Sequence, residues 1–273
     1  MKGKKYASCW KNQEGIHIRE QAEINKKAWE YRAYEFWNRR NGSPREHAKN
    51  IARDPLASLS MHKRYFADIR GKKIANPCGS NGRKAVPLAL LGADVTVFDI
   101  SEENRKYALE LAREANVEIE YVVGDFCETD LTAYGERFDM VYAEGGILHY
   151  FLDIDMFTKT LYGITRKNGL LILSDFHPFR KVISDGFLMF SAPQTKGDYF
   201  DDGVHYGDVA YQSFFPEVEQ SLFPKCLLRF YTLGEIINAV ISAGFTLKEF
   251  WEHPGYEDGK LPGLFTIVAG KSV

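Results

Sequence analysis

The sequence predicts an α/β protein built on a doubly wound, mostly parallel sheet, and three observations support this fold class. Short apolar stretches recur along the chain with little polar alternation, which is typical of parallel strands buried on both faces. Stretches with helical character separate them at the spacing of repeated β-α-β units. The 273 residues accommodate one large α/β domain with decorations, and an apolar fraction of 45% suffices for a full core.

Seven strands are expected. Five apolar runs predict parallel strands at residues 72–77, 94–99, 118–123, 138–143 and 169–175. Two further runs flank the turn-rich stretch PGYEDGKLPG and predict a C-terminal antiparallel hairpin at residues 245–253 and 263–271.

Helices are predicted at 82–91, 102–115, 153–166 and 232–244. Pro87 is unfavourable inside the first of them, because it removes a backbone donor, and it indicates a kink or a later start. The third is expected to end with Arg166 and Lys167 in its last turn. Thr232 and Glu235 predict a capping box at the start of the fourth.

The chain is expected to divide into four segments. Residues 1–70 form an N-terminal helical cap or lid, in which Ser43 and Pro44 start one helix. Residues 71–177 form the ligand-binding core. Residues 178–229 are an aromatic-rich insertion on the substrate side, too long for a simple connection. Residues 230–273 supply the helix and hairpin that complete the core.

Composition limits the possible partners. The formal net charge is −2, which argues against nucleic acid or an acidic membrane as the partner of the whole molecule. Residues 1–70 carry 16 Lys and Arg against 8 Asp and Glu. This segment could be a solvated face, an anion-binding entrance or a contact with the acidic remainder.

The four cysteines, at positions 9, 78, 127 and 226, lack the spacing of a metal site, so no metal is expected. We expect them to be reduced thiols of a cytoplasmic protein. No signal peptide or membrane-spanning stretch is recognised. The oligomeric state stays open.

The turn after the first strand reads NPCGSNG. It keeps Gly79 and Gly82 but lacks the G-x-G-x-x-G pattern that lets a backbone approach a pyrophosphate at a helix N-terminus. A smaller ligand that touches the turn with a ribose and an amino-acid tail fits better. The candidate ligand-binding residues of this turn are Asn76, Pro77, Cys78, Gly79, Ser80 and Gly82.

Further candidates follow the next strands, and all of them belong to the carboxyl edge of the sheet, where open α/β sheets bind ligands. Asp99, followed by Ile100, can accept both hydroxyls of a ribose. Asp125 can accept from an exocyclic amine while Phe126 packs on a purine. The fourth strand ends with Glu144, Gly145 and Gly146.

At this point the chain resembles the class I S-adenosylmethionine-dependent methyltransferases, over residues 72–175 and again over 230–270. The resemblance implies a seven-stranded Rossmann-like sheet with a terminal antiparallel hairpin and S-adenosylmethionine as cofactor. It assigns Asp99 to the ribose, Asp125 and Phe126 to the adenine, and residues 144–146 to the methionine portion.

The first motif departs from the family pattern, which usually has an acid and three glycines. Aligned without gaps, Asn76 stands at the acid, Cys78 and Ser80 at the first two glycines, and Gly82 at the third. Asn76 can still hydrogen-bond the ligand's ammonium, although it lacks the charge. Small side chains keep the turn passable, so we interpret it as a variant site.

Candidates for the acceptor side follow from position. His149 and His177 come after the fourth and fifth strands and are the candidate general bases, if the acceptor needs one. In the resembling family an N-terminal helix often forms a lid, and Trp29 and Tyr31 are the candidates for a contact with the cofactor. The insertion's aromatic residues either line an acceptor pocket or form a small core of their own.

Three functions remain in view. The first is a methyltransferase acting on a small-molecule acceptor, since a helical cap and a long insertion would shield the reaction from water. A nucleic-acid acceptor is not favoured, because no RNA-binding module or Asn/Asp-Pro-Pro-Tyr tetrad is present. The alternatives are an NAD(P)-dependent oxidoreductase and a catalytically silent cofactor-binding protein derived from a methyltransferase.

Overall fold

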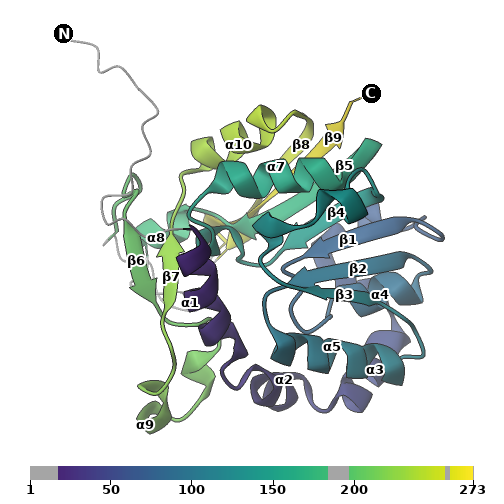
Figure 1. Cartoon of the computed structure of the whole chain (residues 1–273), viewed down its shortest axis with the longest axis horizontal. Coiled ribbons are helices and arrows are strands. Elements are labelled where there is room, and N and C mark those ends of the chain that lie inside the picture. Colours follow the sequence, from purple (N-terminus) through teal and green to yellow (C-terminus); the bar gives the residue numbers. More distant parts are fainter. Residues whose placement is uncertain (1–17, 184–196, 256–258, 273) are drawn as a thin grey trace.

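The computed structural model describes residues 18–183, 197–255 and 259–272, and its centre is a seven-stranded sheet. The strand order is β3-β2-β1-β4-β5-β9-β8 (Figure 1). Strands β1 to β5 are parallel, and β9 runs antiparallel to both β5 and β8. The strands are β1 (Lys73–Pro77), β2 (Asp94–Asp99), β3 (Glu120–Val123), β4 (Phe138–Glu144), β5 (Thr165–Phe176), β8 (Phe245–Gly255) and β9 (Leu261–Lys271).

Helices cover both faces of this sheet, with α7 and α10 on one face and α4 on the other (Figure 1). The fold class predicted from the sequence is therefore confirmed. The helices of the core are α4 (Ala85–Leu90), α5 (Glu102–Glu114), α6 (Leu131–Tyr134), α7 (Ile154–Ile164) and α10 (Leu233–Ser242), with short 3-10 turns η2 (Phe126–Glu128) and η3 (Leu148–Tyr150).

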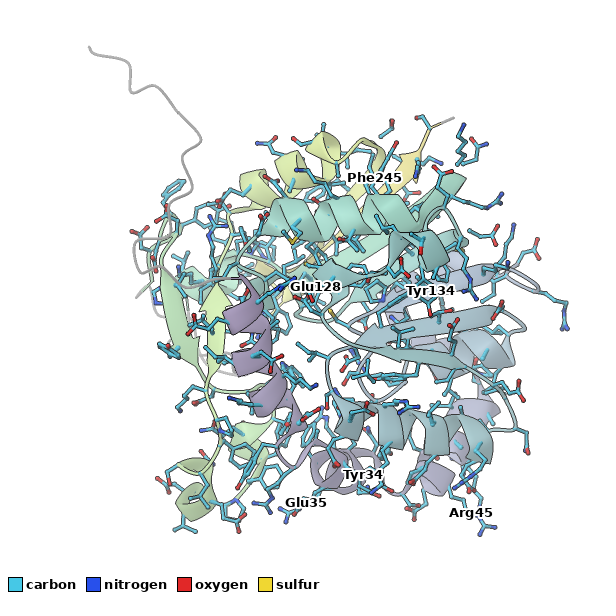
Figure 2. The ribbon with its side chains drawn as sticks, viewed as in Figure 1. Tyr34, Glu35, Arg45, Glu128, Tyr134 and Phe245 are labelled. Carbon is cyan, nitrogen blue, oxygen red and sulfur yellow. The ribbon has the colours of Figure 1, made fainter. Side chains whose placement is uncertain are left out.

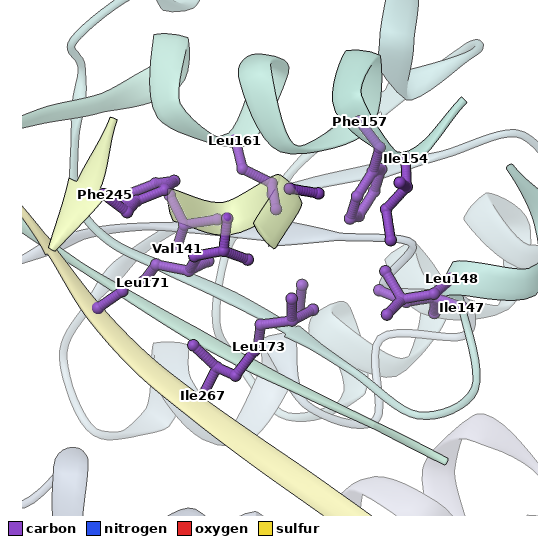
Figure 3. Packing of buried hydrophobic residues seen from close by; sticks show 14 of the residues in the cluster. Val141, Ile147, Leu148, Ile154, Phe157, Leu161, Leu171, Leu173, Phe245 and Ile267 are labelled. Carbon is purple, nitrogen blue, oxygen red and sulfur yellow. The ribbon is translucent and has the colours of Figure 1, made fainter. Parts of the chain in front are cut away.

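The largest hydrophobic cluster lies between the sheet and α7 and α10. Figure 3 shows Phe157 and Leu161 of α7 facing Val141, Leu171 and Leu173 of β4 and β5. All five side chains are fully buried. This apolar layer makes β4 and β5 a rigid base for the residues that follow their carboxyl ends.

The N-terminal segment consists of α1 (Ile18–Glu30), α2 (Ala33–Asn41), α3 (Pro44–Arg53) and the 3-10 stretch η1 (Ala57–Tyr65). Ser43 and Glu46 form a capping box at α3, with Pro44 in its first turn, as the sequence indicates. The side chain of Glu128, labelled beside α1 in Figure 2, pairs with Arg19 at 2.8 Å.

The insertion contributes a second, two-stranded sheet. Its elements are α8 (Phe179–Ile183), β6 (Val204–Gly207), η4 (Gln212–Phe214), α9 (Glu217–Gln220) and β7 (Cys226–Arg229). Tyr211, Phe215 and Phe223 form a buried cluster with Ala28 and Phe36 of the N-terminal helices. The aromatic insertion therefore does form a small core, but one that it shares with α1 and α2.

Two helix boundaries differ from the sequence prediction. α4 starts at Ala85, so Pro87 lies in its first turn, where a backbone donor is not needed. α7 ends at Ile164, and the expectation that Arg166 and Lys167 belong to its last turn is wrong. The hydroxyl of Thr165 donates to the Leu161 carbonyl at 2.6 Å, and the chain passes directly into β5.

Helix α1 is held against the carboxyl edge of the main sheet by two buried amide side chains. Asn25 donates to the carbonyls of Tyr150 and Leu227, both at 3.1 Å, and accepts from the Leu227 N–H at 2.7 Å. Gln21 accepts from the Leu152 N–H at 2.8 Å. α1 therefore bridges η3 and β7 at this edge of the sheet (Figure 1), whereas η1 packs on a face of the sheet and α3 packs against α5.

No helix among the described residues is both long and apolar enough to cross a bilayer.

The hydrogen bonds of Gln21 and Asn25, here called the amide clamp, predict a loss of stability in Asn25→Ala. Truncation leaves the buried Leu227 N–H without its acceptor, which costs about 1–3 kcal/mol. Urea unfolding should show this loss, and Glu23→Ala, at an exposed position of the same helix, should change the free energy of unfolding far less. Equal effects of the two substitutions would contradict the clamp.

Candidate active site

The first βα turn adopts an unusual backbone conformation. Cys78 and Ser80 have φ angles of 52° and 50°, in the left-handed region that non-glycine residues rarely occupy. Gly79 between them has no space for a side chain, because a Cβ would lie 2.5 Å from Asn76 Oδ1 and 2.8 Å from Val97 Cγ1. Strain of this kind concentrates at functional sites, where the surrounding structure enforces it.

Buried polar atoms of this turn lack partners. Asn76 Oδ1, Ser80 Oγ and Asn81 Nδ2 have no hydrogen bond within the described residues. Asn76 Nδ2 donates to the Tyr142 carbonyl at 2.8 Å, which fixes the orientation of the amide. Because buried polar groups are nearly always paired, this mixture of donors and acceptors is suited to a polar ligand.

Asp99, at the end of β2, is 8% exposed and already serves the turn. Its carboxylate accepts from the N–H groups of Ser80 at 2.9 Å and Ser101 at 3.0 Å, and from Asn104 Nδ2 at 3.1 Å. Burial raises its pKa, which these hydrogen bonds oppose. A ribose diol would therefore share oxygens that also hold the backbone. Ile100, half-buried, follows directly.

Asp125 lies between β3 and η2 and accepts from the Cys127 N–H at 2.9 Å. Burial raises its pKa. The ring of Phe126 is 4% exposed and packs against Phe98 and Phe157 in the core. A stacking role for this ring on the purine is not supported, since the ring faces inward.

The charges of three strand-end carboxylates act on the thiol of Cys78. Burial raises the pKa of this thiol well above its usual value, and the negative charges of Asp99, Asp125 and Asp175 raise it further. Asp99 also contacts the turn directly, through the Ser80 N–H. Asp175 was missed in the sequence, although an acid at the end of the fifth strand is the same signal that identified Asp99.

The segment after β4 lies against the other side of the turn. Glu144 pairs with Arg83 at 2.7 Å. Burial alone would raise the pKa of Glu144, but the charges of Arg83 and Lys84 together lower it. Gly145 and Gly146 have φ angles of 103° and 79°, so both need glycine. The sequence did not single out Arg83.

A cavity of about 590 Å³ lies beyond the carboxyl ends of β4 and β5. It is bounded by η3, the end of β5, α8 and the β6–β7 sheet. A Cβ on Gly146 would lie 2.3 Å from the ring of Phe176, which lines the cavity. The cavity and the fourth-strand segment therefore share a wall. Its aromatic and histidine lining comprises His149, Phe176, His177, Tyr199, His205, Tyr206, Phe230 and Tyr231.

The two candidate histidines differ in their surroundings. His149 lies in the cavity wall, with its ring nearly parallel to those of Phe230 and Phe176. Burial lowers its pKa to about 3. His177 uses both ring nitrogens, because Nδ1 accepts from the Phe179 N–H at 3.2 Å and Nε2 lies 3.0 Å from Glu252 Oε1. His149 is therefore the better placed of the two to meet an acceptor.

Glu252, on β8, is the acidic partner of His177 that the sequence did not reveal. The two positions are 75 residues apart, and only the antiparallel hairpin brings them together. Burial lowers the pKa of His177, and the carboxylate of Glu252 opposes this effect. The pair joins the end of β5 to the edge strand.

The two candidate lid residues lie at the end of α1. The Trp29 carbonyl accepts from Ser101 Oγ at 3.0 Å, next to Asp99, and its ring packs edge-on against Tyr150. Tyr31 packs against Phe223 of the insertion instead. Trp29 is thus close to the candidate site, whereas Tyr31 belongs to the cluster shared with the insertion.

Known proteins resemble this chain in sequence. A family model described as "Methyltransferase domain" matches residues 77–173. A ubiquinone biosynthesis O-methyltransferase from Methylobacterium nodulans is 28% identical over 199 residues, covering 73% of this chain and 66% of that protein. One from Methylobacterium sp. is 33% identical over 132 residues, covering 48% and 47%. The chain thus spans less than two thirds of the length of these relatives.

Solved structures share the fold. An S-adenosylmethionine-dependent methyltransferase from Mesorhizobium loti has a TM-score of 0.60 at 19% identity, covering 78% of this chain and 97% of that one. A magnesium protoporphyrin IX methyltransferase from Synechocystis with bound S-adenosylhomocysteine has a TM-score of 0.57 at 15% identity, covering 92% and 100%. The family model, the curated relatives and the shared fold together support the class I S-adenosylmethionine-dependent methyltransferase family for this chain.

Proposed function

We propose that this protein transfers the methyl group of S-adenosylmethionine to a small molecule bound in the cavity beyond β4 and β5. The observation that carries the proposal is the position of this cavity, which is lined by Asp175, one of three acids whose charges act on Cys78 in the first βα turn. When bound, the cofactor supplies an electrophilic methyl group on a positively charged sulfonium.

The residues at the turn fit this cofactor. Its sulfonium and ammonium are cationic, and the carboxylates of Asp99, Asp125 and Asp175, whose pKa values burial raises, would be stabilised by a nearby cation. The unpartnered atoms Asn76 Oδ1 and Ser80 Oγ can accept from an ammonium or a hydroxyl group. In this arrangement Asp99 holds the ribose, Asp125 the adenine, and residues 144–146 the methionine portion.

The acceptor side fits a small, flat molecule. The cavity volume of about 590 Å³ is within the range of small-molecule sites. Rings from β5, the insertion and the segment after β7 form most of its wall, and such walls favour planar ligands. Relatives named as ubiquinone biosynthesis O-methyltransferases support a small-molecule acceptor over a nucleic acid.

The chain's main contribution to the reaction is placement. The cap and the insertion exclude water, while the shared wall between Gly146 and Phe176 brings the acceptor beside the cofactor edge. His149 is neutral at neutral pH, since its pKa is about 3, and this low pKa suits its ring to orienting the acceptor rather than to taking its proton.

The two alternative functions are not favoured. An NAD(P)-dependent oxidoreductase would need space for a pyrophosphate, but the turn carries side chains at positions 78 and 80, where that motif has glycine. A silent cofactor-binding protein would not need the aromatic cavity beside the turn. The described cysteines are free thiols, which supports the cytoplasm as the compartment.

Cofactor binding tests the proposal directly. Isothermal titration with S-adenosylhomocysteine should give a dissociation constant near ~1 µM, and Asp99→Asn should weaken it roughly tenfold or more, about 1.4 kcal/mol. Asp94→Asn, at the exposed opposite end of the same strand, is the matched control and should bind as the wild type does. Absence of binding to the wild type would remove the proposal, and fluorescence of bound NADH would revive the oxidoreductase.

The histidine assignment predicts a loss of turnover without a loss of cofactor affinity. Once an acceptor is found in a panel of phenols, carboxylic acids and amines, His149→Gln should lower kcat by roughly 10²-fold. The dissociation constant for S-adenosylhomocysteine should stay within about twofold. The control is His47→Gln, which alters a histidine of α3 that contacts Tyr107 of α5 and should retain kcat. Unchanged turnover in His149→Gln would contradict a role of this ring in the reaction.

A further inference from the structure

Asp175 occupies the junction between the candidate cofactor edge and the acceptor cavity. Its side chain is 3% exposed, at the carboxyl end of β5. Its charge reaches Cys78 in the first βα turn, and the same residue lines the cavity. In the part of the chain that the structure describes, neither Asp99 nor Asp125 lines this cavity. Asp175 therefore faces both candidate binding regions.

Backbone N–H groups hold the carboxylate of Asp175. Oδ2 accepts from Ile147 at 2.8 Å and from Leu148 at 2.7 Å, and Oδ1 accepts from Phe176 at 2.5 Å. The N–H of Gly145 donates to the Ser174 carbonyl at 3.1 Å. The turn that follows β4 is thus attached to the end of β5 by three of these four hydrogen bonds.

This turn needs an external anchor. Gly145 and Gly146 both have positive φ angles, and consecutive glycines impose little conformational restriction of their own. Glu144 precedes the turn on the cofactor side, and His149 follows it in the cavity wall. Any shift of the turn would therefore move both sides of the reaction relative to each other.

We propose that Asp175 is a positioning residue, whose ionised carboxylate fixes the turn between β4 and η3. It thereby fixes the position of Glu144, on the side of the cofactor, relative to His149 in the wall of the acceptor cavity. This inference rests on the proposed function of the site. Asp175 acts through the backbone of residues 145–148. The ionised form is the one that suits the turn, because it offers acceptors on both oxygens, whereas a protonated carboxyl turns one oxygen into a donor.

The carboxylate titrates within an accessible pH range. Burial raises the pKa of Asp175 to about 6, against the lowering by its backbone hydrogen bonds and by Arg180 of α8. The charge of Asp175 also acts on Cys78 of the first βα turn and on Tyr150 of η3, while His149 lines the same cavity and is kept neutral here by its pKa of about 3. Below about pH 6 the protonated form therefore predominates, and the hydrogen bonds that Asp175 accepts from the turn are weakened.

Binding of S-adenosylhomocysteine as a function of pH tests this role without an acceptor. Between about pH 7 and pH 5 the ionised fraction of a group with a pKa of about 6 falls from roughly nine tenths to one tenth. The wild-type dissociation constant should therefore rise about tenfold over this interval. Asp175→Asn should bind roughly tenfold more weakly at pH 7 and show no such dependence. Asp68→Asn, at an exposed carboxylate, should follow the wild type.

The outcomes separate the two proposals. Binding by Asp175→Asn with wild-type affinity and the wild-type pH dependence overturns the role of Asp175 and leaves the methyltransferase intact. No binding to the wild type at any pH removes the proposed function itself. Since burial also raises the pKa values of Asp99 and Asp125, the assignment depends on the loss of the pH dependence in Asp175→Asn. If Asp175→Asn does not fold, Asp175→Glu replaces it in the experiment. An unchanged midpoint of the pH dependence of S-adenosylhomocysteine binding in Asp175→Glu would then overturn the role of Asp175.

Discussion

The site depends on negative charge that is buried at one edge of a sheet and held there by backbone N–H groups. Asp99 binds the N–H of Ser80 and Ser101, and Asp175 binds those of the turn after β4. These bonds keep both carboxylates buried and oriented, yet burial still raises their pKa values. A cation placed between them would relieve that cost. The same hydrogen bonds shape the loops. The carboxylates therefore determine both the charge and the backbone geometry of this edge of the sheet.

The additions to the sheet enclose this edge. Helix α1 is clamped by Gln21 and Asn25 between η3 and β7, and the insertion shares an aromatic cluster with α1 and α2. The cap and the insertion therefore form one cover, although they are far apart in sequence. The segment after β4 links this cover to the sheet, because it binds Asp175 on one side and carries Tyr150 against Trp29 on the other.

The strands and the acids at their ends could be predicted from the sequence because both follow local rules: apolar runs for buried strands, and side chains that directly follow them. The inward ring of Phe126 could not, since its direction depends on packing against Phe98 and Phe157. Glu252 meets His177 only through strand pairing, so no local pattern reveals it. Trp29 and Tyr31 differ in role because one ring packs against Tyr150 and the other against Phe223, and no local pattern reveals these contacts. The division of the chain into four segments stays a prediction.

The central claim is that the carboxyl-side acids of neighbouring strands share one ligand, and a crystal structure with S-adenosylhomocysteine tests it most directly. The account predicts electron density for the nucleoside over the turn from Asn76 to Gly82, with the ribose on Asp99, the adenine beside Asp125 and the sulfur facing the cavity at Gly146. Density elsewhere on the molecule, or a complex in which Asp99 and Asp125 do not contact the ligand, would contradict it.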